Sequence, residues 1–435
     1  MRLYFRDIER VGETPTAATR GRVFVSNHYN ALIDPILVLT DAPCEISPIA
    51  KSTLWDVPGL RWLLDRAGAV PIIRRKDAPD KQTGANDVAF DRIAQHLATG
   101  GNILIFPEGT SHSEPQLAPL KSGAARMLLA AEKAGAPDVT FQAAALEFDA
   151  RDDFRSRALV LWGPVRRFAD VASEPPAGDH DDPDDPDDPD DPDDPDEARV
   201  RAATAQMDAD LRELLVDADT HDERRLIAHV AEILAHDSGD PSLQGWSNIG
   251  RQVELASRTL RTVDPELVAR VGERVGAYFA ELARLGLRDL DVARADGASR
   301  RELPPPSWTG QLRRIAIAPL AATGFVLYAI PYVIPRYLAR KTDPDAISTI
   351  KLGAALVIYP LWAAGLVTAS FVLLPMPLSL VGAIVAVASP FAALEWLDRY
   401  WLRSPQVSDD DRAGLARLRV AAIAAIDEAR AKLPS

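Results

Sequence analysis

Two residues near the start of the chain have the types and spacing of a catalytic base and its orienting partner. The segment 26–35 reads SNHYNALIDP and contains His28 and Asp34, with five residues between them. An imidazole can accept a proton near neutral pH, and a neighbouring carboxylate can fix its tautomer and stabilise the protonated ring. A strand candidate, RVFVS at 22–26, ends just before His28, and open α/β sheets place their sites at the carboxyl ends of strands. Most such His–Asp pairs are structural, so this pair alone leaves both interpretations open.

A second segment, 102–127, has the pattern of an anion site. It reads NILIFPEGTSHSEPQLAPLKSGAARM, so a buried-type strand runs into a turn that contains Gly109 and Thr110. Glycine permits a tight turn with exposed backbone N–H groups, and threonine adds a hydroxyl. Lys121 then precedes a helix start, which also favours anions. Within the same segment, His112 is a weaker candidate, because a histidine in a surface loop usually has no assigned role.

A third segment, 50–75, ends in a cluster of cations. Gly68 and Arg74 bracket a short strand candidate, and Arg74, Arg75 and Lys76 follow one another at its end. An arginine can hold a phosphate with two hydrogen bonds. Taken alone, the cluster fits a solvated basic loop better than a phosphate site.

The elements that must position these residues alternate between strand and helix patterns over residues 1–172. The strand candidates are RVFVS (22–26), EISPIA (45–50), AVPIIR (69–74), NILIF (102–106), VTFQAAAL (139–146) and ALVLWG (158–163). Helix patterns lie between several of them, at 86–100 and 122–135. This alternation predicts an α/β domain with a largely parallel sheet flanked by helices.

The formal net charge of −14 comes from one place. Residues 179–197 hold twelve Asp and one Glu with no Lys or Arg, and without them 50 acidic residues face 49 basic ones. We expect 173–197, with its DDP repeat, to be a disordered acidic linker. The chain has no basic stripe with interleaved aromatics, which disfavours nucleic acid as a partner. Cys44 is the single cysteine, so no intrachain disulfide is possible. The sequence has no His/Cys cluster that would predict a metal site.

The second half of the chain is predicted to be helical and then membrane-embedded. Residues 198–300 read as a helical region, 301–404 as a membrane region and 405–435 as a helical tail. No charge interrupts residues 352–394, which is long enough for two spans, at 352–373 and 378–394. Basic residues flank the apolar segment 315–335 on both sides and follow the last span, so the positive-inside rule places all three flanks in the cytoplasm. The segment 315–335 is then re-entrant, and three full spans is the alternative.

Together the three blocks resemble the glycerophospholipid acyltransferase family, which includes glycerol-3-phosphate and 1-acyl-glycerol-3-phosphate acyltransferases. The resemblance covers residues 20–165 and rests on Asn27-His28 with Asp34, the block from Gly68 to Arg74, the sequence from Phe106 to Thr110, and an apolar strand, FQAAAL. It implies catalysis by His28 and Asp34. It implies phosphate binding by Arg74, Gly109, Thr110, Lys121 and the loop that contains Glu108. The Glu108 carboxylate would repel a phosphate, so we expect it to hold the loop or to pair with a basic residue. The residues implied to shape the site are Asn27, Asn30, Gly68, Phe106 and Pro107.

Two positions depart from the family pattern. The common spacing is His-x4-Asp, whereas here Ile33 stands at the expected position and Asp34 follows it. A subgroup of bacterial and fungal members resembles this chain in that respect, in FRSR at 154–157 and in its C-terminal membrane segments. Residues six apart lie about 240° around a helix axis, so we expect His28 to lie on the loop before the helix. The fourth block has Ala143 where the family usually has Pro.

The resemblance implies acyl transfer from acyl-CoA or acyl carrier protein to a glycerophosphate hydroxyl, without a resident cofactor. The acceptor is 1-acyl-glycerol-3-phosphate, glycerol-3-phosphate or dihydroxyacetone phosphate, and a different lipid hydroxyl is a further alternative. The enzyme would be a multi-pass protein of the inner cell membrane with its catalytic domain on the cytoplasmic face. The rival from another class is a catalytically inactive, membrane-anchored lipid-binding protein.

Overall fold

The computed structural model describes residues 1, 3–56, 60–73, 87–150, 153–172, 194–240, 242–295, 308–342, 347–398 and 407–433. The chain forms two compact units, which are described separately. The N-terminal unit comprises Met1–Arg151 and Ser156–Asp217, and the C-terminal unit comprises Asp152–Arg155 and Ala218–Ser435.

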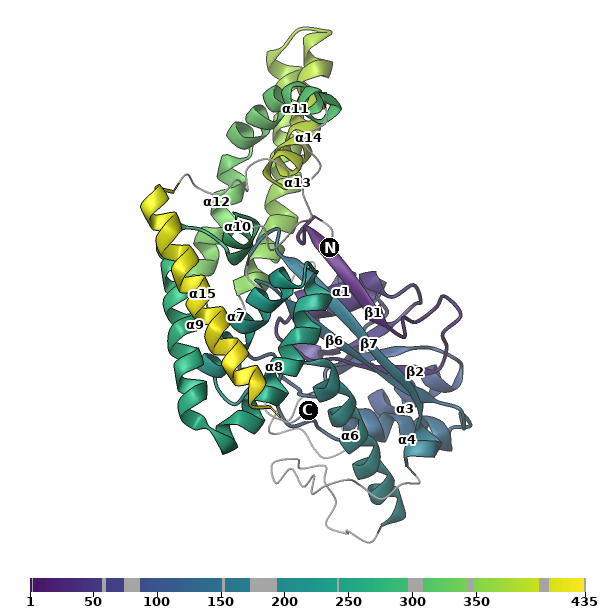
Figure 1. The fold of residues 1–435 in the computed structure, drawn as a ribbon. Helices are drawn as coiled ribbons and strands as arrows, with labels where there is room; N and C mark the ends of the chain where they lie inside the picture. The colour runs from purple at the N-terminus through teal and green to yellow at the C-terminus, as the bar shows by residue number, and fades with distance from the viewer. Residues whose placement is uncertain are drawn as a thin grey trace. The chain divides into compact units, whose positions relative to one another are not determined.

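The N-terminal unit is built on a seven-stranded sheet with the order β1-β7-β6-β2-β5-β3-β4 (Figure 1). The strands are β1 (Asp7–Gly12), β2 (Arg22–Val25), β3 (Ser47–Lys51), β4 (Val70–Ile72), β5 (Ile103–Ile105), β6 (Thr140–Phe148) and β7 (Arg157–Arg167). Among these strands only the β6–β7 pair is antiparallel. The predicted fold class is confirmed, and every predicted strand is present.

Strand β2 occupies the middle of the sheet, between β5 and β6. Val23, Phe24 and Val25 are fully buried, although their side chains alternate between the two faces. Both faces of the sheet are therefore covered here, as in other parallel sheets. The helices of this unit are α1 (Ile33–Asp41), α2 (Leu60–Arg66), α3 (Asp87–Ala98), α4 (Gly123–Lys133), α5 (Phe168–Val171) and α6 (Pro195–Leu214), with a short 3₁₀ helix, η1 (Ser52–Asp56).

Helix α6 corrects the predicted end of the acidic linker. The Asp194 side chain accepts a hydrogen bond from the backbone N–H of Asp196, and Pro195 occupies the first turn, so Asp-Pro-Asp-Glu starts a helix. Glu197 then accepts hydrogen bonds of 2.7 and 2.9 Å from Arg126 on α4. Helix α6 packs on α4, β6 and β7, so it belongs to the N-terminal unit and not to the following helical region. Residues 173–193 of the predicted linker lie outside the described residues.

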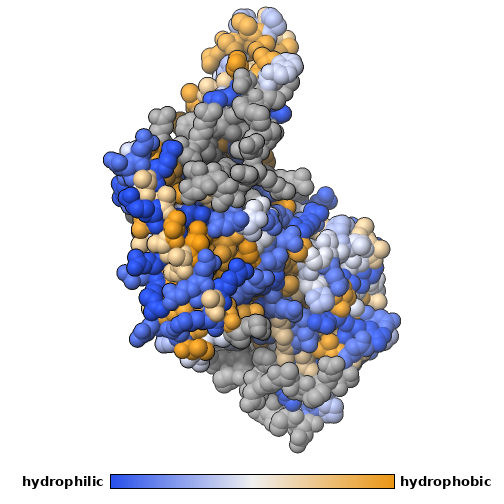
Figure 2. Space-filling view, in the orientation of Figure 1, coloured by the Kyte–Doolittle hydropathy of each residue, from blue (hydrophilic) through white to orange (hydrophobic). Residues whose placement is uncertain are grey.

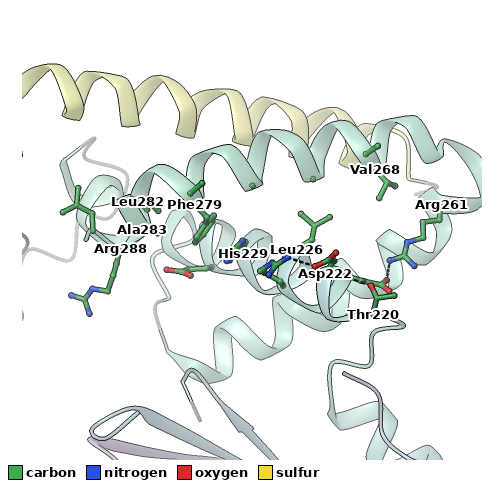
Figure 3. Close-up of a pocket in the computed structure, with 18 residues that line it drawn as sticks. Thr220, Asp222, Leu226, His229, Arg261, Val268, Phe279, Leu282, Ala283 and Arg288 are labelled. Carbon is green, nitrogen blue, oxygen red and sulfur yellow. Dashed lines mark hydrogen bonds and ion pairs between the residues drawn. The ribbon is translucent and has the colours of Figure 1, made fainter. Parts of the chain in front are cut away.

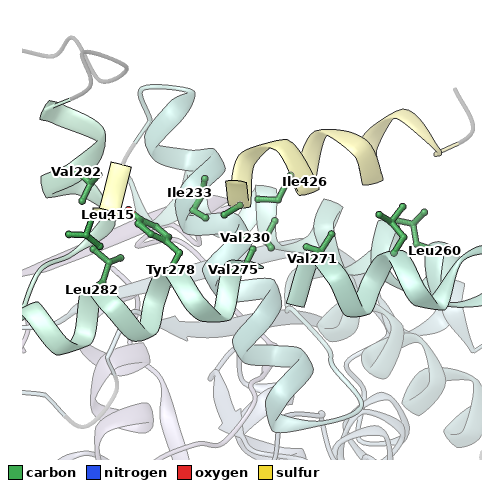
Figure 4. Close-up of a cluster of buried hydrophobic side chains, with 12 residues drawn as sticks. Val230, Ile233, Leu260, Val271, Val275, Tyr278, Leu282, Val292, Leu415 and Ile426 are labelled. Atoms are coloured by element: carbon green, nitrogen blue, oxygen red, sulfur yellow. The ribbon is translucent and has the colours of Figure 1, made fainter. Parts of the chain in front are cut away.

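The C-terminal unit contains a helical bundle. Its helices are α7 (His221–Asp237), α8 (Leu243–Val263), α9 (Pro265–Leu285), α10 (Asp289–Ala295) and α15 (Asp409–Ala431). Asp264 caps α9 through a 3.0 Å hydrogen bond from the Leu267 N–H, and Gly286 ends it in the left-handed conformation, with φ 66°. An apolar stripe on α9 faces the bundle core, where Val271, Val275 and Tyr278 are buried together (Figure 4).

Four further helices of this unit are strongly apolar: α11 (Trp308–Leu327), α12 (Ala329–Leu338), α13 (Ile347–Leu373) and α14 (Leu378–Trp396). By length and composition α13 and α14 could each cross a membrane, and α11 with α12 forms a bent pair, at 46°, that would make a third span if it crossed. A short 3₁₀ helix, η3 (Ala339–Lys341), follows α12. Figure 2 shows apolar side chains gathered on the surface around the turn between α13 and α14, at the top of the view.

Candidate active site

The site lies where two neighbouring parallel strands end. Strands β2 and β5 pair in register from Val23–Ile103 to Val25–Ile105, so the loops after them meet at the same edge of the sheet. Asn27, in the loop after β2, is tied to β6: its side-chain amide donates to the Leu146 carbonyl at 3.0 Å, and its oxygen accepts from the Leu146 N–H at 2.8 Å. These bonds fix the backbone immediately before His28.

The structure brings His28 and Asp34 together. His28 Nδ1 lies 3.1 Å from Asp34 Oδ2. Helix α1 begins at Ile33, so Asp34 is in its first turn while His28 lies in the preceding loop, and the extra residue of the x5 spacing is absorbed there. Asp34 Oδ2 also accepts a 2.6 Å hydrogen bond from the Asn30 N–H. With Nδ1 facing the carboxylate, Nε2 is the ring nitrogen that remains to accept a proton.

Burial sets the electrostatics of this pair. Asp34 has no solvent exposure, and this burial raises the pKa of its carboxyl, while the His28 ring and the backbone N–H of Asn30 oppose the shift. His28 is 8 % exposed, and its ring stacks on Phe106, with 4.1 Å between ring centroids. The imidazole is therefore held from two sides, by a carboxylate and by an aromatic face.

Glu108 belongs to the loop predicted to bind phosphate, and its contacts match the loop-holding role expected of its carboxylate rather than direct phosphate binding. Its side chain is buried, and both carboxylate oxygens are already used by the protein. Oε1 accepts a 2.7 Å hydrogen bond from the His28 N–H, and Oε2 accepts a 3.0 Å bond from the Ala118 N–H and contacts the His112 ring. An enclosed anion of this kind repels a phosphate. Glu108 instead fixes the loops around His28.

His112 is the residue that the sequence interpretation undervalued. Its backbone N–H donates to the His28 carbonyl at 3.1 Å, and its ring Nε2 meets Glu108 Oε2. The backbone of His28 is thus held at its N–H by Glu108 and at its carbonyl by His112. No local sequence pattern reveals how the His28 backbone is held, because Glu108 lies 80 positions away from His28 in the sequence.

The other predicted anion-binding residues gather in the loop after β5. Gly109 adopts φ 73°, and a Cβ atom there would lie 3.2 Å from Cδ and Cε of Lys121. The backbone N–H of Lys121 donates to the Pro107 carbonyl at 2.9 Å. The aliphatic part of Lys121 therefore lies against Gly109, and Thr110 is the exposed next residue. Arg74, with Arg75 and Lys76, lies outside the described residues.

The remaining site-shaping residues have local structural roles. Gly68 adopts φ 63° in the turn that leads from α2 to β4. Ala143, where the family usually has proline, lies at a break in the β6–β7 register between Gln142 and Ala144. A β-bulge is one of the few sheet positions that accept proline, so alanine there leaves the strand geometry intact. The Asn30 side chain is fully buried and, within the described part of the chain, forms no side-chain hydrogen bond.

A separate pocket of about 940 Å³ lies in the C-terminal unit, between α7 and α9 (Figure 3). None of the predicted site residues lines it. Its most distinctive contact is the stacking of His229 on Phe279, with 3.7 Å between ring centroids. Burial, with a smaller effect of Arg225, lowers the pKa of His229 to about 4. The ring is neutral at pH 7 and lies against Phe279 as part of the pocket wall.

Comparison with known proteins identifies the class of the N-terminal domain. Residues 7–143 match the family model named Acyltransferase. The N-terminal unit therefore contains an acyltransferase domain.

Individual relatives are similar over shorter stretches. The chain is 42 % identical over 82 residues, 18 % of its length, to glycerol-3-phosphate O-acyltransferase 2 of Saccharomyces cerevisiae. It is 30 % identical over 136 residues, 31 % of its length, to 1-acyl-sn-glycerol-3-phosphate acyltransferase BAT2, chloroplastic, of Brassica napus. It spans 11 % and 36 % of these relatives. The crystal structure of the 1-acyl-sn-glycerophosphate acyltransferase of Thermotoga maritima covers 40 % of this chain and is itself covered over 66 %, with 16 % identity and a TM-score of 0.29.

Proposed function

We propose that the protein transfers a fatty acyl group from a thioester, acyl-CoA or acyl carrier protein, to a hydroxyl of 1-acyl-glycerol-3-phosphate or glycerol-3-phosphate. The observation that carries this proposal is the 3.1 Å pair of His28 Nδ1 and Asp34 Oδ2, at the carboxyl end of the central strand of an acyltransferase domain. The names of the relatives support the two acceptors.

The chemistry needs one base and no covalent enzyme intermediate. His28 Nε2 removes the proton of the acceptor hydroxyl as its oxygen attacks the thioester carbonyl. Asp34 stabilises the imidazolium that forms. When the tetrahedral intermediate collapses, the C–S bond breaks and the thiolate takes the proton from His28, which regenerates the neutral base. The ester and the free thiol are the products.

The acceptor phosphate is proposed to bind the loop after β5. Gly109 forms the turn there, with its own N–H bound to the Phe106 carbonyl at 3.0 Å. Thr110 supplies a hydroxyl, and Lys121 supplies a positive charge on a side chain whose stem lies against Gly109. Arg74 completes this proposed set. The apolar helices α13 and α14 would anchor the protein in the inner cell membrane with the catalytic domain on the cytoplasmic face, so that soluble donor and lipid acceptor meet at the bilayer surface.

The test is acyl transfer in membranes that contain the full chain. Labelled palmitoyl-CoA or palmitoyl-carrier protein is offered with lysophosphatidate or glycerol-3-phosphate in turn, to wild type, His28→Ala, Asp34→Ala and the exposed control His221→Ala. We expect activity in wild type and His221→Ala, with a loss of at least about 10²-fold in the other two. Loss in His28→Ala alone would mean that Asp34 is not the orienting partner. Inactive wild type with every donor and acceptor would favour a lipid-binding protein or a different lipid hydroxyl.

A further inference from the structure

Helices from both sides of the apolar region pack into one bundle. Helix α15 follows α14 in the chain, yet its Leu415, Ala422 and Ile426 are buried against residues of α7 and α9, which precede α11 (Figure 4). Charged contacts reinforce this packing: Arg419 on α15 binds Asp289 at 2.9 Å and Asp237 at 2.6 Å. A helix that shares a core with α7 and α9 must lie on the same side of a membrane as they do.

This packing fixes the parity of the membrane crossings. A chain that leaves the bundle after α10 and returns to it as α15 crosses a bilayer an even number of times. Helices α13 and α14 are apolar and contain 27 and 19 residues, and at 1.5 Å per residue they are about 40 and 28 Å long. Each is long enough for one crossing. Helices α13 and α14 already provide two crossings. A third crossing by the α11–α12 pair would make the number odd, so this pair does not cross.

Side-chain contacts show where α11 begins and how far it reaches. Near its start, Arg313 forms a 2.5 Å ion pair with Glu395, and Arg314 lies 5.6 Å from the ring centroid of Trp396, both at the end of α14. After its last residue, the Tyr328 hydroxyl donates to the Ala386 carbonyl at 2.8 Å, in the middle of α14. Helix α11 therefore starts at the face where α14 ends and reaches the interior of the hairpin.

Helix α12 returns toward the face from which α11 came. The Leu327 carbonyl, just before α12, accepts a 2.9 Å hydrogen bond from Trp362, in the middle of α13. At the other end of α12, η3 contacts α13, and only residues 342–346 separate η3 from Ile347, the first residue of α13. Six residue steps span at most about 21 Å, roughly half the length of α13. The end of α12 therefore lies near the beginning of α13.

We infer that α11 and α12 form a re-entrant pair, which enters the bilayer from the face of the α7–α10 and α15 bundle and returns to that face. Arg336 and Arg340 then reach the headgroup layer, where each stacks on an aromatic ring, at 5.1 Å from Tyr332 and 5.9 Å from Tyr337 respectively. Arginine and tyrosine are typical of that layer, and an anionic lipid surface attracts the arginines. Ile330, Val333 and Leu338 are exposed apolar side chains on the same helix, which suits contact with lipid. This inference does not depend on acyl transfer.

The test is the sidedness of single cysteines in the full-length protein. Cys44 is the native cysteine to remove, as Cys44→Ser, and one cysteine is then introduced at a time: Ala277→Cys on α9, Thr342→Cys after α12, Met376→Cys in the α13–α14 turn, or Ala413→Cys on α15. A membrane-impermeant maleimide is applied to right-side-out and inside-out vesicles. We expect positions 277, 342 and 413 to be labelled from one face and position 376 from the other.

A spanning α11–α12 pair predicts a different pattern. Positions 277 and 376 would then share one face, and 342 and 413 the other, which would overturn the inference. Labelling of 342 from the face opposite to 277 is sufficient for this conclusion. Labelling requires no catalysis, so an inactive wild type would contradict the proposed function and leave this result standing.

Discussion

The Oε1 atom of Glu108 lies 2.7 Å from the backbone nitrogen of His28 and accepts its hydrogen bond. This bond joins the loop after β5 to the loop after β2. The second oxygen of the same carboxylate accepts the Ala118 N–H at 3.0 Å and contacts the His112 ring. A buried carboxylate thus connects the proposed base to the loop proposed to bind phosphate.

Replacement of Glu108 by glutamine tests this connection. The amide keeps one acceptor oxygen but turns an NH₂ group toward the backbone N–H of His28 or of Ala118, so one donor stays unsatisfied. We expect acyl transfer to fall by about 10- to 100-fold, as for a small displacement of a catalytic group, and the free energy of unfolding to fall by about 1–3 kcal/mol. Glu114→Gln, at an exposed carboxylate of the same loop, is the control. Equal activity in the two variants would show that Glu108 does not position His28.

His112 is predicted to be a positioning residue that acts through Glu108. In His112→Gln the side-chain amide can still donate to Glu108, whereas His112→Phe has no donor. We expect kcat to fall at least about tenfold in the phenylalanine variant, with KM for the thioester nearly unchanged, and to recover partly in the glutamine variant. Steady-state kinetics of both variants give the kcat and KM values for this comparison. An equal loss in both would mean that the ring only fills space.

Asp34→Asn should change the catalytic activity and the pH dependence of stability in different ways. The amide cannot stabilise an imidazolium, so we expect acyl transfer to fall by about 10²- to 10⁴-fold. Because burial raises the pKa of Asp34 in the folded protein, ionisation of this carboxyl opposes folding. The stability of the wild type relative to Asp34→Asn should therefore fall as the pH rises above the unfolded pKa of about 3.9. Thermal unfolding in detergent between pH 4 and neutrality measures this, and a difference that is constant with pH would contradict it.

The sequence predicted the parts of the fold and site that depend on local patterns. Strands β2, β5 and β6 are nearly continuous apolar runs because both faces of the sheet are covered, and motifs at their ends located His28 and the Gly109 turn. Strand β1 was not predicted, because it is an edge strand with a polar sequence, DIERVG. The contacts of Glu108 and of the His112 N–H with the His28 backbone were not predicted either. They depend on two loops that meet only when β2 and β5 pair.

The same limit applies to the C-terminal unit. The helical character of this region was predicted, and α9 has local signals for it, with a cap at Asp264 and a left-handed Gly286 at its end. The docking of α15 on α9 has no local signal, since the two helices are separated by the whole apolar region. The number of membrane spans could not be decided without that contact, which is why the charge pattern alone left two and three spans open.

A buried polar network holds α15 in the bundle. Asp289 has no solvent exposure and accepts hydrogen bonds from the Tyr278 hydroxyl at 2.6 Å and from Arg419 at 2.9 Å, while His236 Nδ1 lies 2.7 Å away. Burial alone would raise the pKa of Asp289, but the contacts with His236, Arg419 and Tyr278 outweigh it and lower the pKa to about 2.

This network predicts an acid-sensitive bundle. A lowered carboxyl pKa stabilises the folded state above the unfolded pKa of about 3.9, and this contribution, about 2 kcal/mol, is lost as the pH falls toward 2. Asp289→Asn should therefore destabilise the bundle by about this amount or more at pH 7, and the difference from wild type should shrink in acid. Asp222→Asn, which removes a highly exposed partner of Arg225, is the control. Denaturation monitored by helical circular dichroism tests this, and identical midpoints for Asp289→Asn and Asp222→Asn at pH 7 would refute it.

Helix α11 approaches α14 closely at Gly324. A Cβ atom at Gly324 would lie 2.1 Å from the carbonyl oxygen of Ser389 and 3.0 Å from the Cβ of Ala393, whereas nothing lies within 4 Å of one at Gly353 on α13. Small residues allow helices to approach in a membrane, so Gly324→Ala must force α11 away from α14. We expect Gly324→Ala to lower the thermal midpoint of the detergent-solubilised protein, while Gly353→Ala leaves it unchanged or raises it, because alanine favours helix by about 1 kcal/mol over glycine. If both variants unfold at the temperature of the wild type, α11 does not pack closely on α14 at Gly324.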